Sequence, residues 1–217
     1  MDFTNREVYL KSLKDIKEHK INVQPSLIYQ LLIKVNEFEN FTSLIVNFDS
    51  KIKDKYKGKT FYLKTYGCQM NEHDSENIEA LLTGLGFKKV DNYENADLVL
   101  LNTCSIRENA HNKAFGMLGR LKHLKAQKKD LIVGLCGCMA QEASVVEEII
   151  KKYSWVNFVF GTHNMYQLPN IIDRAIEENK QQIEVFSKEG DLVEGLPVIR
   201  TNNYKAYVNI IYGCNKF

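Results

Sequence analysis

Three cysteines recur at nearly equal spacing, and each one follows an apolar segment of the sequence. Cys68, Cys104 and Cys138 stand 36 and 34 residues apart, about the length of one strand-loop-helix unit. In an open parallel sheet such a unit brings successive strand ends to the same edge, so the three thiols are predicted to meet in one crevice. Three thiolates without a fourth protein ligand would hold a metal or an iron-sulfur cluster with an open coordination position. An open position is where such a centre can do chemistry.

Other residues near these cysteines leave alternatives open. Cys136 lies two residues before Cys138 and would share its face of a strand, so it could be a fourth ligand, although packing in the core is the simpler interpretation. A zinc site with three cysteines would need a histidine, and the candidates are His73 and His111. Neither has the close spacing of a zinc finger, which favours solvated helix positions. Each cysteine taken alone could also be a small buried side chain without a metal.

The composition is typical of a soluble globular protein. The chain has 217 residues, of which 44% are hydrophobic and 26% charged, and its formal net charge of +2 does not by itself require a nucleic-acid partner. No apolar stretch approaches the length of a membrane span, and the N-terminal residues contain no signal-peptide core. The five cysteines are an odd number without an export signal, which favours metal or redox chemistry over disulfides. We therefore expect a cytoplasmic protein.

The elements that must position the cysteines begin after a less regular N-terminal part. Residues 1–59 predict a helical extension that ends in a lysine-rich linker, whereas residues 60–180 alternate between apolar strands and helices. Residues 181–203 carry no strong period and predict an irregular connector, and residues 204–217 begin another strand. Strands that alternate with helices are typical of an α/β fold with a doubly wound parallel sheet, of the Rossmann or flavodoxin-like kind. The four predicted core strands are TFYLKTY, ADLVLLNT, LIVGLCG and VNFVFG.

Longer motifs surround the cysteines. In chain order they are TYGCQMNEHDSE, NTCSIRENA, GCMAQ and YVNIIYGCNKF. Together they resemble the methylthiotransferases of the radical S-adenosylmethionine class, over about residues 60 to 217. The resemblance implies a methylthiotransferase N-terminal domain, followed by the first strand of a truncated radical barrel. We therefore expect the chain to be the N-terminal part of an enzyme and to be inactive alone.

The resemblance implies roles for four of the five cysteines. Cys68, Cys104 and Cys138 match the three cysteines that hold the family's auxiliary [4Fe–4S] cluster. Cys214 matches the first cysteine of the CxxxCxxC motif that holds the radical-generating [4Fe–4S] cluster. That second cluster and S-adenosylmethionine would be bound only by the full-length enzyme. Cys136 stands where the family does not require a cysteine, which supports the packing interpretation.

The first two motifs also indicate a branch of the family. The pairing of GCQMN with NTCSIRE resembles the branch that acts on tRNA carrying N6-dimethylallyladenosine next to the anticodon and forms its 2-methylthio derivative. This reaction replaces an unactivated aromatic C–H bond, which calls for a radical cofactor. Sister branches, which act on threonylcarbamoyladenosine in tRNA or on a ribosomal protein, are the alternative. Further implied partners are a reductant and proteins that donate sulfur or the cluster; we expect a monomer and no contact with a membrane.

A basic segment could provide a surface for the RNA. The residues from Ile106 to Lys129 include many lysines and arginines but only one acidic residue, Glu108. Within the segment, Arg120, Lys122 and Lys125 are the candidates for contacts with tRNA phosphates. The alternative is a solvated helix whose cations favour its C-terminal end.

Two functions of other classes stay open. One is a flavodoxin-like module that binds a small ligand or RNA without iron. The other is a thiol redox or zinc protein that uses the same cysteines.

Overall fold

The computed structural model describes residues 56–105, 108–185, 196–200 and 204–207. All of them belong to the unit Lys51–Phe217, one of two units into which the chain divides. The predicted helices of the N-terminal extension and Cys214 lie outside the described residues.

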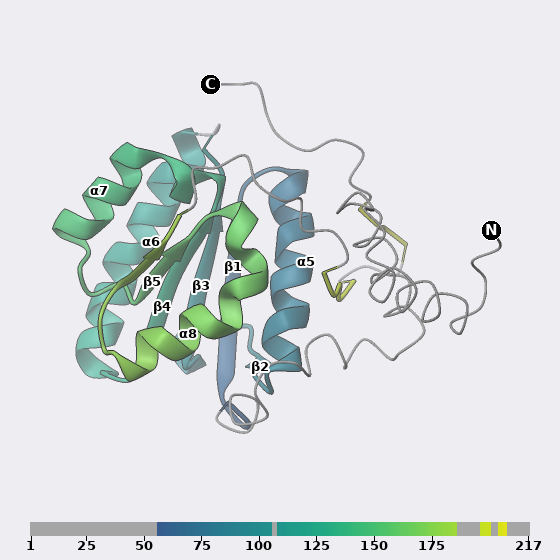
Figure 1. Cartoon of the computed structure of the whole chain (residues 1–217), viewed down its shortest axis with the longest axis horizontal. Coiled ribbons are helices and arrows are strands. Elements are labelled where there is room, and N and C mark those ends of the chain that lie inside the picture. Colours follow the sequence, from purple (N-terminus) through teal and green to yellow (C-terminus); the bar gives the residue numbers. More distant parts are fainter. Residues whose placement is uncertain (1–55, 106–107, 186–195, 201–203, 208–217) are drawn as a thin grey trace, which may run out of the picture. The chain divides into compact units, whose positions relative to one another are not determined.

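The fold is built on one parallel sheet of six strands (Figure 1). The strand order is β2-β1-β3-β4-β5-β6, so the chain winds from β1 to β2 in one direction and from β3 to β6 in the other. In sheets of this kind the switch between the two directions, here between β1 and β3, opens a crevice at the carboxyl ends of the strands. The strands are β1 Thr60–Tyr66, β2 Lys88–Lys89, β3 Leu98–Thr103, β4 Ile132–Gly137, β5 Phe158–Phe160 and β6 Gln182–Glu184. This arrangement confirms the predicted doubly wound α/β fold.

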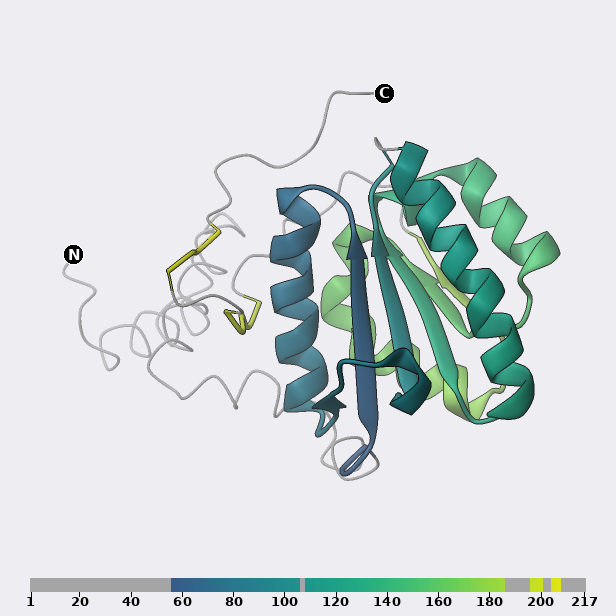
Figure 2. The ribbon, with the colours of Figure 1, turned by 180° about the vertical axis from the view of Figure 1, so that it is seen from behind.

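Four helices cover the two faces of the sheet. Helices α6 (Glu108–Gln127) and α7 (Ala143–Lys152) pack on one face, and α5 (Gln69–Gly84) and α8 (Leu168–Glu177) on the other (Figures 1 and 2). Three short 3-10 helices, η1 Tyr93–Asn95, η2 Cys138–Gln141 and η3 Thr162–Gln167, complete the connections. None of the helices in the described part of the chain is long and apolar enough to span a bilayer.

The β3 and β4 strands explain why both faces are covered. All six residues of β3 are buried, as are five of the six in β4, which is typical of strands between two helix layers. Successive residues of a strand point to opposite faces of the sheet. The side chains on the α6 and α7 face form one core with those two helices, and they include Val99, Leu101, Val133, Leu135 and Val159.

The strand register places one polar row near the carboxyl edge, on the face that α5 covers. Thr65 of β1 pairs with Asn102 of β3, which pairs with Cys136 of β4. Asn102 is fully buried although it lies in an otherwise apolar strand. A buried amide needs hydrogen-bond partners, so this row marks a constrained part of the fold.

The two edge strands were not predicted from the sequence. β2 has two residues and β6 has three, and neither contains an apolar run. β6 lies in the segment 181–203, for which the sequence predicted an irregular connector. Both strands form because β1 and β5 offer a ladder of hydrogen-bonding groups at the sheet margin, which is a tertiary effect.

Candidate metal centre at the carboxyl edge of the sheet

The three evenly spaced cysteines lie at the carboxyl ends of three adjacent strands. Cys68 follows β1 and is the residue that precedes α5, Cys104 follows β3 directly, and Cys138 follows β4 and begins η2. Cys104 is buried, whereas Cys68 and Cys138 are partly exposed. The positions are those that the spacing predicts, on both sides of the switch between β1 and β3.

Electrostatics link the three thiols to one another. The pKa of Cys138 is raised to about 12, first by burial, then by the charge of Asp74, and then by the charges of Cys104 and Cys68. Burial also raises the pKa of Asp74 to about 7. Burial and the neighbouring negative charges therefore favour the neutral Cys138 thiol, and a cationic group in the site would favour its thiolate. Such a site is suited to a positively charged metal or cluster.

Within the described ranges, no three side chains of histidine, cysteine, aspartate or glutamate converge closely enough to hold one metal ion. A zinc ion needs all of its ligands at about 2.0 to 2.3 Å from one point. In a [4Fe–4S] cluster, by contrast, each thiolate binds a different iron, so the thiolates stand apart. The separation of the three thiols is therefore the property that distinguishes these two kinds of centre.

A buried network of polar side chains holds the first two cysteine loops together. Asn71 Oδ1 accepts a hydrogen bond from the backbone N–H of Cys68 at 3.1 Å, and Asn71 Nδ2 donates to Asn102 Oδ1 at 3.3 Å and to the Thr103 carbonyl at 3.2 Å. Asn102 Nδ2 donates to the Asn71 carbonyl at 2.8 Å and to Ser75 Oγ at 2.9 Å. We call Asn71, Ser75 and Asn102 the asparagine network. It ties the loop after β1 to the end of β3.

Two glycines precede cysteines because the network leaves no space for a side chain. A Cβ atom on Gly67 would lie 2.1 Å from Asn71 Oδ1. A Cβ atom on Gly137 would lie 2.2 Å from the Thr103 carbonyl oxygen and 2.5 Å from Asn102 Oδ1. Gly137 also has φ +97°, a conformation that residues with side chains rarely adopt. The same contacts therefore position the loops before Cys68 and Cys138.

Sequence reasoning missed the asparagine network, although a signal was present. Asn102 stands inside the apolar strand LVLLNT, and Asn71 lies three residues after Cys68 in GCQMN. A polar side chain in a strand that is buried on both faces must find a partner inside the protein. Which residue becomes that partner depends on the order of the strands in the sheet, and the sequence alone does not reveal this order.

The remaining candidate ligands have other surroundings. Cys136 is fully buried, and the adjacent strand fixes it through a hydrogen bond of 2.7 Å from Thr103 Oγ1 to its carbonyl oxygen. The His73 ring lies 6.1 Å from that of Tyr207, and His111 stacks on Phe115 with 4.3 Å between ring centroids. Packing in the core stays the simpler interpretation of Cys136.

Known proteins similar to this chain share its central part. The family model described as "Uncharacterized protein family UPF0004" matches residues 60–161, the part that contains all three strand-end cysteines. These residues are similar to that family. Similar proteins include the tRNA-2-methylthio-N(6)-dimethylallyladenosine synthases of Staphylococcus aureus strains JH9, Newman and Mu3, each 51% identical over 175 residues. The matched region covers 79% of this chain and 34% of the relative, so the chain spans about a third of the length of the curated relatives that it matches.

Two of the three predicted RNA-binding residues are exposed on α6. Arg120 and Lys122 have exposed side chains, while Lys125 is half-buried. Lys125 Nζ donates to the Leu131 carbonyl at 2.6 Å and to Asn157 Oδ1 at 2.7 Å. Burial lowers the pKa of Lys125, against the opposing charge of Asp130. The ammonium group of Lys125 thus links α6 to the loops before β4 and β5.

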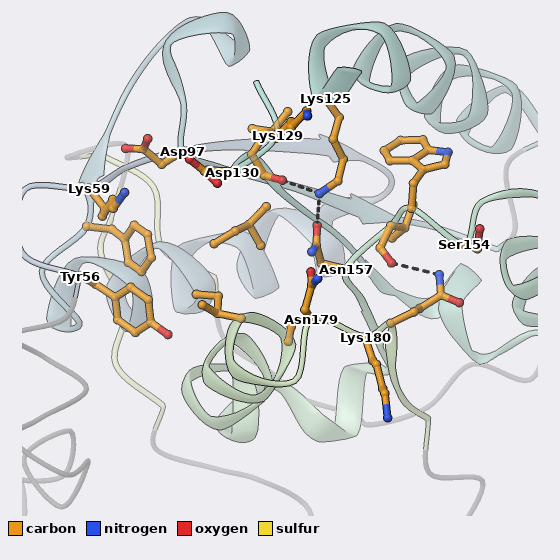
Figure 3. A pocket seen from close by; sticks show the side chains of 18 residues that line it. Tyr56, Lys59, Asp97, Lys125, Lys129, Asp130, Ser154, Asn157, Asn179 and Lys180 are labelled. Carbon is orange, nitrogen blue, oxygen red and sulfur yellow. Dashed lines mark hydrogen bonds between the residues drawn. The ribbon is translucent and has the colours of Figure 1, made fainter. Parts of the chain in front are cut away.

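Lys125 lines a cavity at the opposite edge of the sheet from the cysteines. The cavity has a volume of about 460 Å³, and its lining includes Lys59, Asp97 and Asn157, each of which directly precedes a strand (Figure 3). It therefore lies at the amino ends of the strands. The chemistry predicted for the cysteines takes place at the other end, so this cavity belongs to a separate part of the domain.

Asp97 links the amino ends of β1 and β3. Its Oδ2 accepts hydrogen bonds from the backbone N–H of Thr60 at 2.8 Å and from Thr60 Oγ1 at 3.0 Å, and its Oδ1 lies 3.4 Å from Lys128 Nζ. Burial alone would raise the pKa of Asp97, but the Thr60 hydrogen bonds and the Lys128 charge outweigh this effect and lower it. The folded protein therefore favours the ionised carboxylate.

Proposed function

We propose that this chain is the part of a tRNA methylthiotransferase that holds an auxiliary [4Fe–4S] cluster through Cys68, Cys104 and Cys138. The observation that carries the proposal is the position of these cysteines at the carboxyl ends of β1, β3 and β4, around the switch point of the sheet. When bound, such a cluster supplies the sulfur to be transferred and an iron without a protein ligand. The similar staphylococcal proteins, named as tRNA-modifying synthases, support this assignment.

The residues of this chain prepare the site before the cluster binds. The asparagine network fixes the backbone at Cys68 and the end of β3, and Gly137 lets the chain turn tightly before Cys138. Burial of Cys104 keeps water from part of the site. Cys136 packs in the core in this proposal, since a fourth thiolate would close the position on which the function depends.

The substrate in this proposal is tRNA that carries N6-dimethylallyladenosine next to the anticodon, and the product is its 2-methylthio derivative. The similarity to the named synthases favours this branch over the sister branches. A second [4Fe–4S] cluster, of which Cys214 would be the first ligand, and S-adenosylmethionine would act in the full-length enzyme. A reductant and donors of sulfur or of the cluster would be partners of this cytoplasmic, monomeric enzyme.

The proposed division of the chain follows from these roles. Residues 60–180 together with the edge strand β6 form the cluster-binding domain, the rest of residues 181–203 connects it to the start of the radical domain at 204–217, and residues 1–59 are an extension. The family match at residues 60–161 supports the first of these ranges.

Iron and acid-labile sulfide analysis of the anaerobically reconstituted chain tests the proposal. We expect about four irons and four sulfides per chain. Alanine at Cys68, Cys104 or Cys138 should abolish this content, whereas Cys136→Ala is the matched control and should retain it. Stoichiometric zinc, a folded protein that takes up no iron, or loss of the cluster in Cys136→Ala would each contradict the proposal.

A further inference from the structure

A shallow groove runs along α6 beside the loop that carries Cys68. It consists of two adjoining hollows that share Tyr66, Asn109 and Lys113 in their lining. The first hollow extends to Gly67, the residue before Cys68, and the second extends along the helix. We call the second hollow the α6 groove; it is lined by Tyr66, Asn109, Asn112, Lys113, Gly116 and Arg120. Asn109, Lys113, Gly116 and Arg120 follow one another at intervals of three or four positions, with Asn112 beside Lys113, so the five helix residues occupy one face of α6.

The two hollows together have a cationic end and an acidic end. Lys113 and Arg120 are exposed and lie about 10 Å apart along the helix axis, because each residue adds about 1.5 Å. Glu72 of α5 lines only the first hollow, next to Gly67. An anionic ligand is therefore favoured in the α6 groove, between Lys113 and Arg120, over the first hollow. The two cations are far enough apart to contact two different phosphates of a nucleic-acid strand.

Tyr66 provides an aromatic side chain in the same groove. Its ring is half-buried at the end of β1 and packs partly against the α6 and α7 core. Burial and the neighbouring Tyr62 raise the pKa of Tyr66, while the charge of Arg120 lowers it. An aromatic ring beside cations is the usual combination where proteins hold single-stranded nucleic acid, because bases stack on the ring and phosphates pair with the cations.

Gly116 opens the centre of the groove without serving the packing of the domain. A Cβ atom at this position would have no other atom within 4 Å in the described residues. Glycine inside a helix costs about 1 kcal/mol relative to alanine, so the helix is weakened here with no gain in packing. The missing side chain lets another molecule approach the helix backbone closely.

We propose that the α6 groove binds the sugar-phosphate backbone of the substrate tRNA next to the cysteine site. Lys113 and Arg120 contact phosphates, the amides of Asn109 and Asn112 contact sugar and phosphate oxygens, and Tyr66 stacks on a base. Because the neighbouring hollow reaches Gly67, a strand held in this way passes directly beside Cys68. The proposal rests on the proposed function, since it takes the RNA substrate from there, but it concerns different residues.

Binding of the full chain to a labelled anticodon stem-loop RNA tests the proposal. Lys113→Ala and Arg120→Ala should each weaken binding and reduce the slope of log Kd against log salt concentration by about 0.7 to 1, the effect of losing one phosphate contact. Gly116→Gln should fill the groove and lose most of the affinity. Its unfolding midpoint in urea should stay the same or rise, because a Cβ atom there lies in open space and glutamine favours a helix more than glycine does.

A cation outside the groove provides the control. Lys88 is exposed on β2 and lines neither hollow, so Lys88→Ala should bind the RNA almost as tightly as the unsubstituted chain. No RNA binding by the unsubstituted chain, full affinity in Gly116→Gln, or an equal loss in Lys88→Ala would overturn the groove proposal. The iron content of each protein is measured in parallel. Groove variants that hold a normal cluster and still bind RNA with unchanged affinity would refute the groove proposal alone. An unsubstituted chain that takes up no cluster would instead refute the proposed function.

Discussion

Replacing Gly137 with alanine tests the central structural idea, that close contacts behind the cysteines hold their loops in place. Gly137 separates Cys136 from Cys138 and has φ +97° and ψ −171°. The new methyl group would lie 2.2 Å from the Thr103 carbonyl oxygen and 2.5 Å from Asn102 Oδ1. Neither a backbone carbonyl nor a fully buried amide can move without breaking other contacts.

The expected cost follows from two contributions. Placing a residue other than glycine in such a backbone region costs about 1 to 3 kcal/mol. Displacing Asn102 breaks its hydrogen bonds to the Asn71 carbonyl and Ser75 Oγ, and each such bond contributes about 0.5 to 1.5 kcal/mol. We therefore expect Gly137→Ala to lower the free energy of unfolding by about 2 to 6 kcal/mol, a large part of the 5 to 15 kcal/mol typical of a domain.

Urea unfolding followed by circular dichroism measures this loss, and Gly119→Ala is the matched control. Gly119 is exposed inside α6, where a Cβ atom would meet nothing within 4 Å. The same substitution should there raise the free energy of unfolding by up to about 1 kcal/mol. Equal stability of Gly137→Ala and the unsubstituted protein would refute the reasoning, because the contacts of Gly137 would then be soft. A destabilised Gly119→Ala would show that the helix requires glycine for a reason other than open space.

Three further substitutions test single contacts, each by urea unfolding. Asn102→Ala should lower the free energy of unfolding by about 3 kcal/mol, since it removes three buried hydrogen bonds worth about 1 kcal/mol each; a loss below about 1 kcal/mol would contradict the asparagine network. Lys125→Met should lower the free energy of unfolding by about 1 to 2 kcal/mol, because it removes the ammonium group that bonds two loops. Lys122→Met should change the free energy of unfolding by less than about 0.5 kcal/mol, and equal effects of the two substitutions would argue against the structural role of Lys125. Asp97 has a lowered pKa in the folded protein, so it stabilises the fold above its unfolded pKa of about 3.9 and ceases to do so as the pH falls through its folded pKa. The stability difference between Asp97→Asn and the unsubstituted protein should therefore shrink as the pH falls from about 6 to 3, and a constant difference would refute this.

The sequence predicted the parts of the fold that apolar periodicity encodes. The four core strands were recognised because β1, β3, β4 and β5 contain apolar runs between helical segments. The cysteine spacing correctly indicated their common edge, since a parallel α/β repeat returns each strand end to the same side.

The parts that were not predicted depend on contacts between distant residues. The edge strands at Lys88 and Gln182 form next to existing strands and have no apolar pattern of their own. The role of Lys125 could not be separated from that of its basic neighbours, because the two oxygens that it bonds come from loops before other strands. The α6 groove includes Tyr66 from β1 for the same reason.

The asparagine network has a consequence for the order in which this centre would mature. It joins the loop after β1 to the end of β3 through protein groups alone, without a contribution from iron. Small zinc domains, in contrast, fold only when their metal arrives. Here the central strands can pair first, and the proposed cluster would then enter a folded apoprotein. Loss of the cluster by oxidation should for the same reason leave a folded domain that is able to be loaded again.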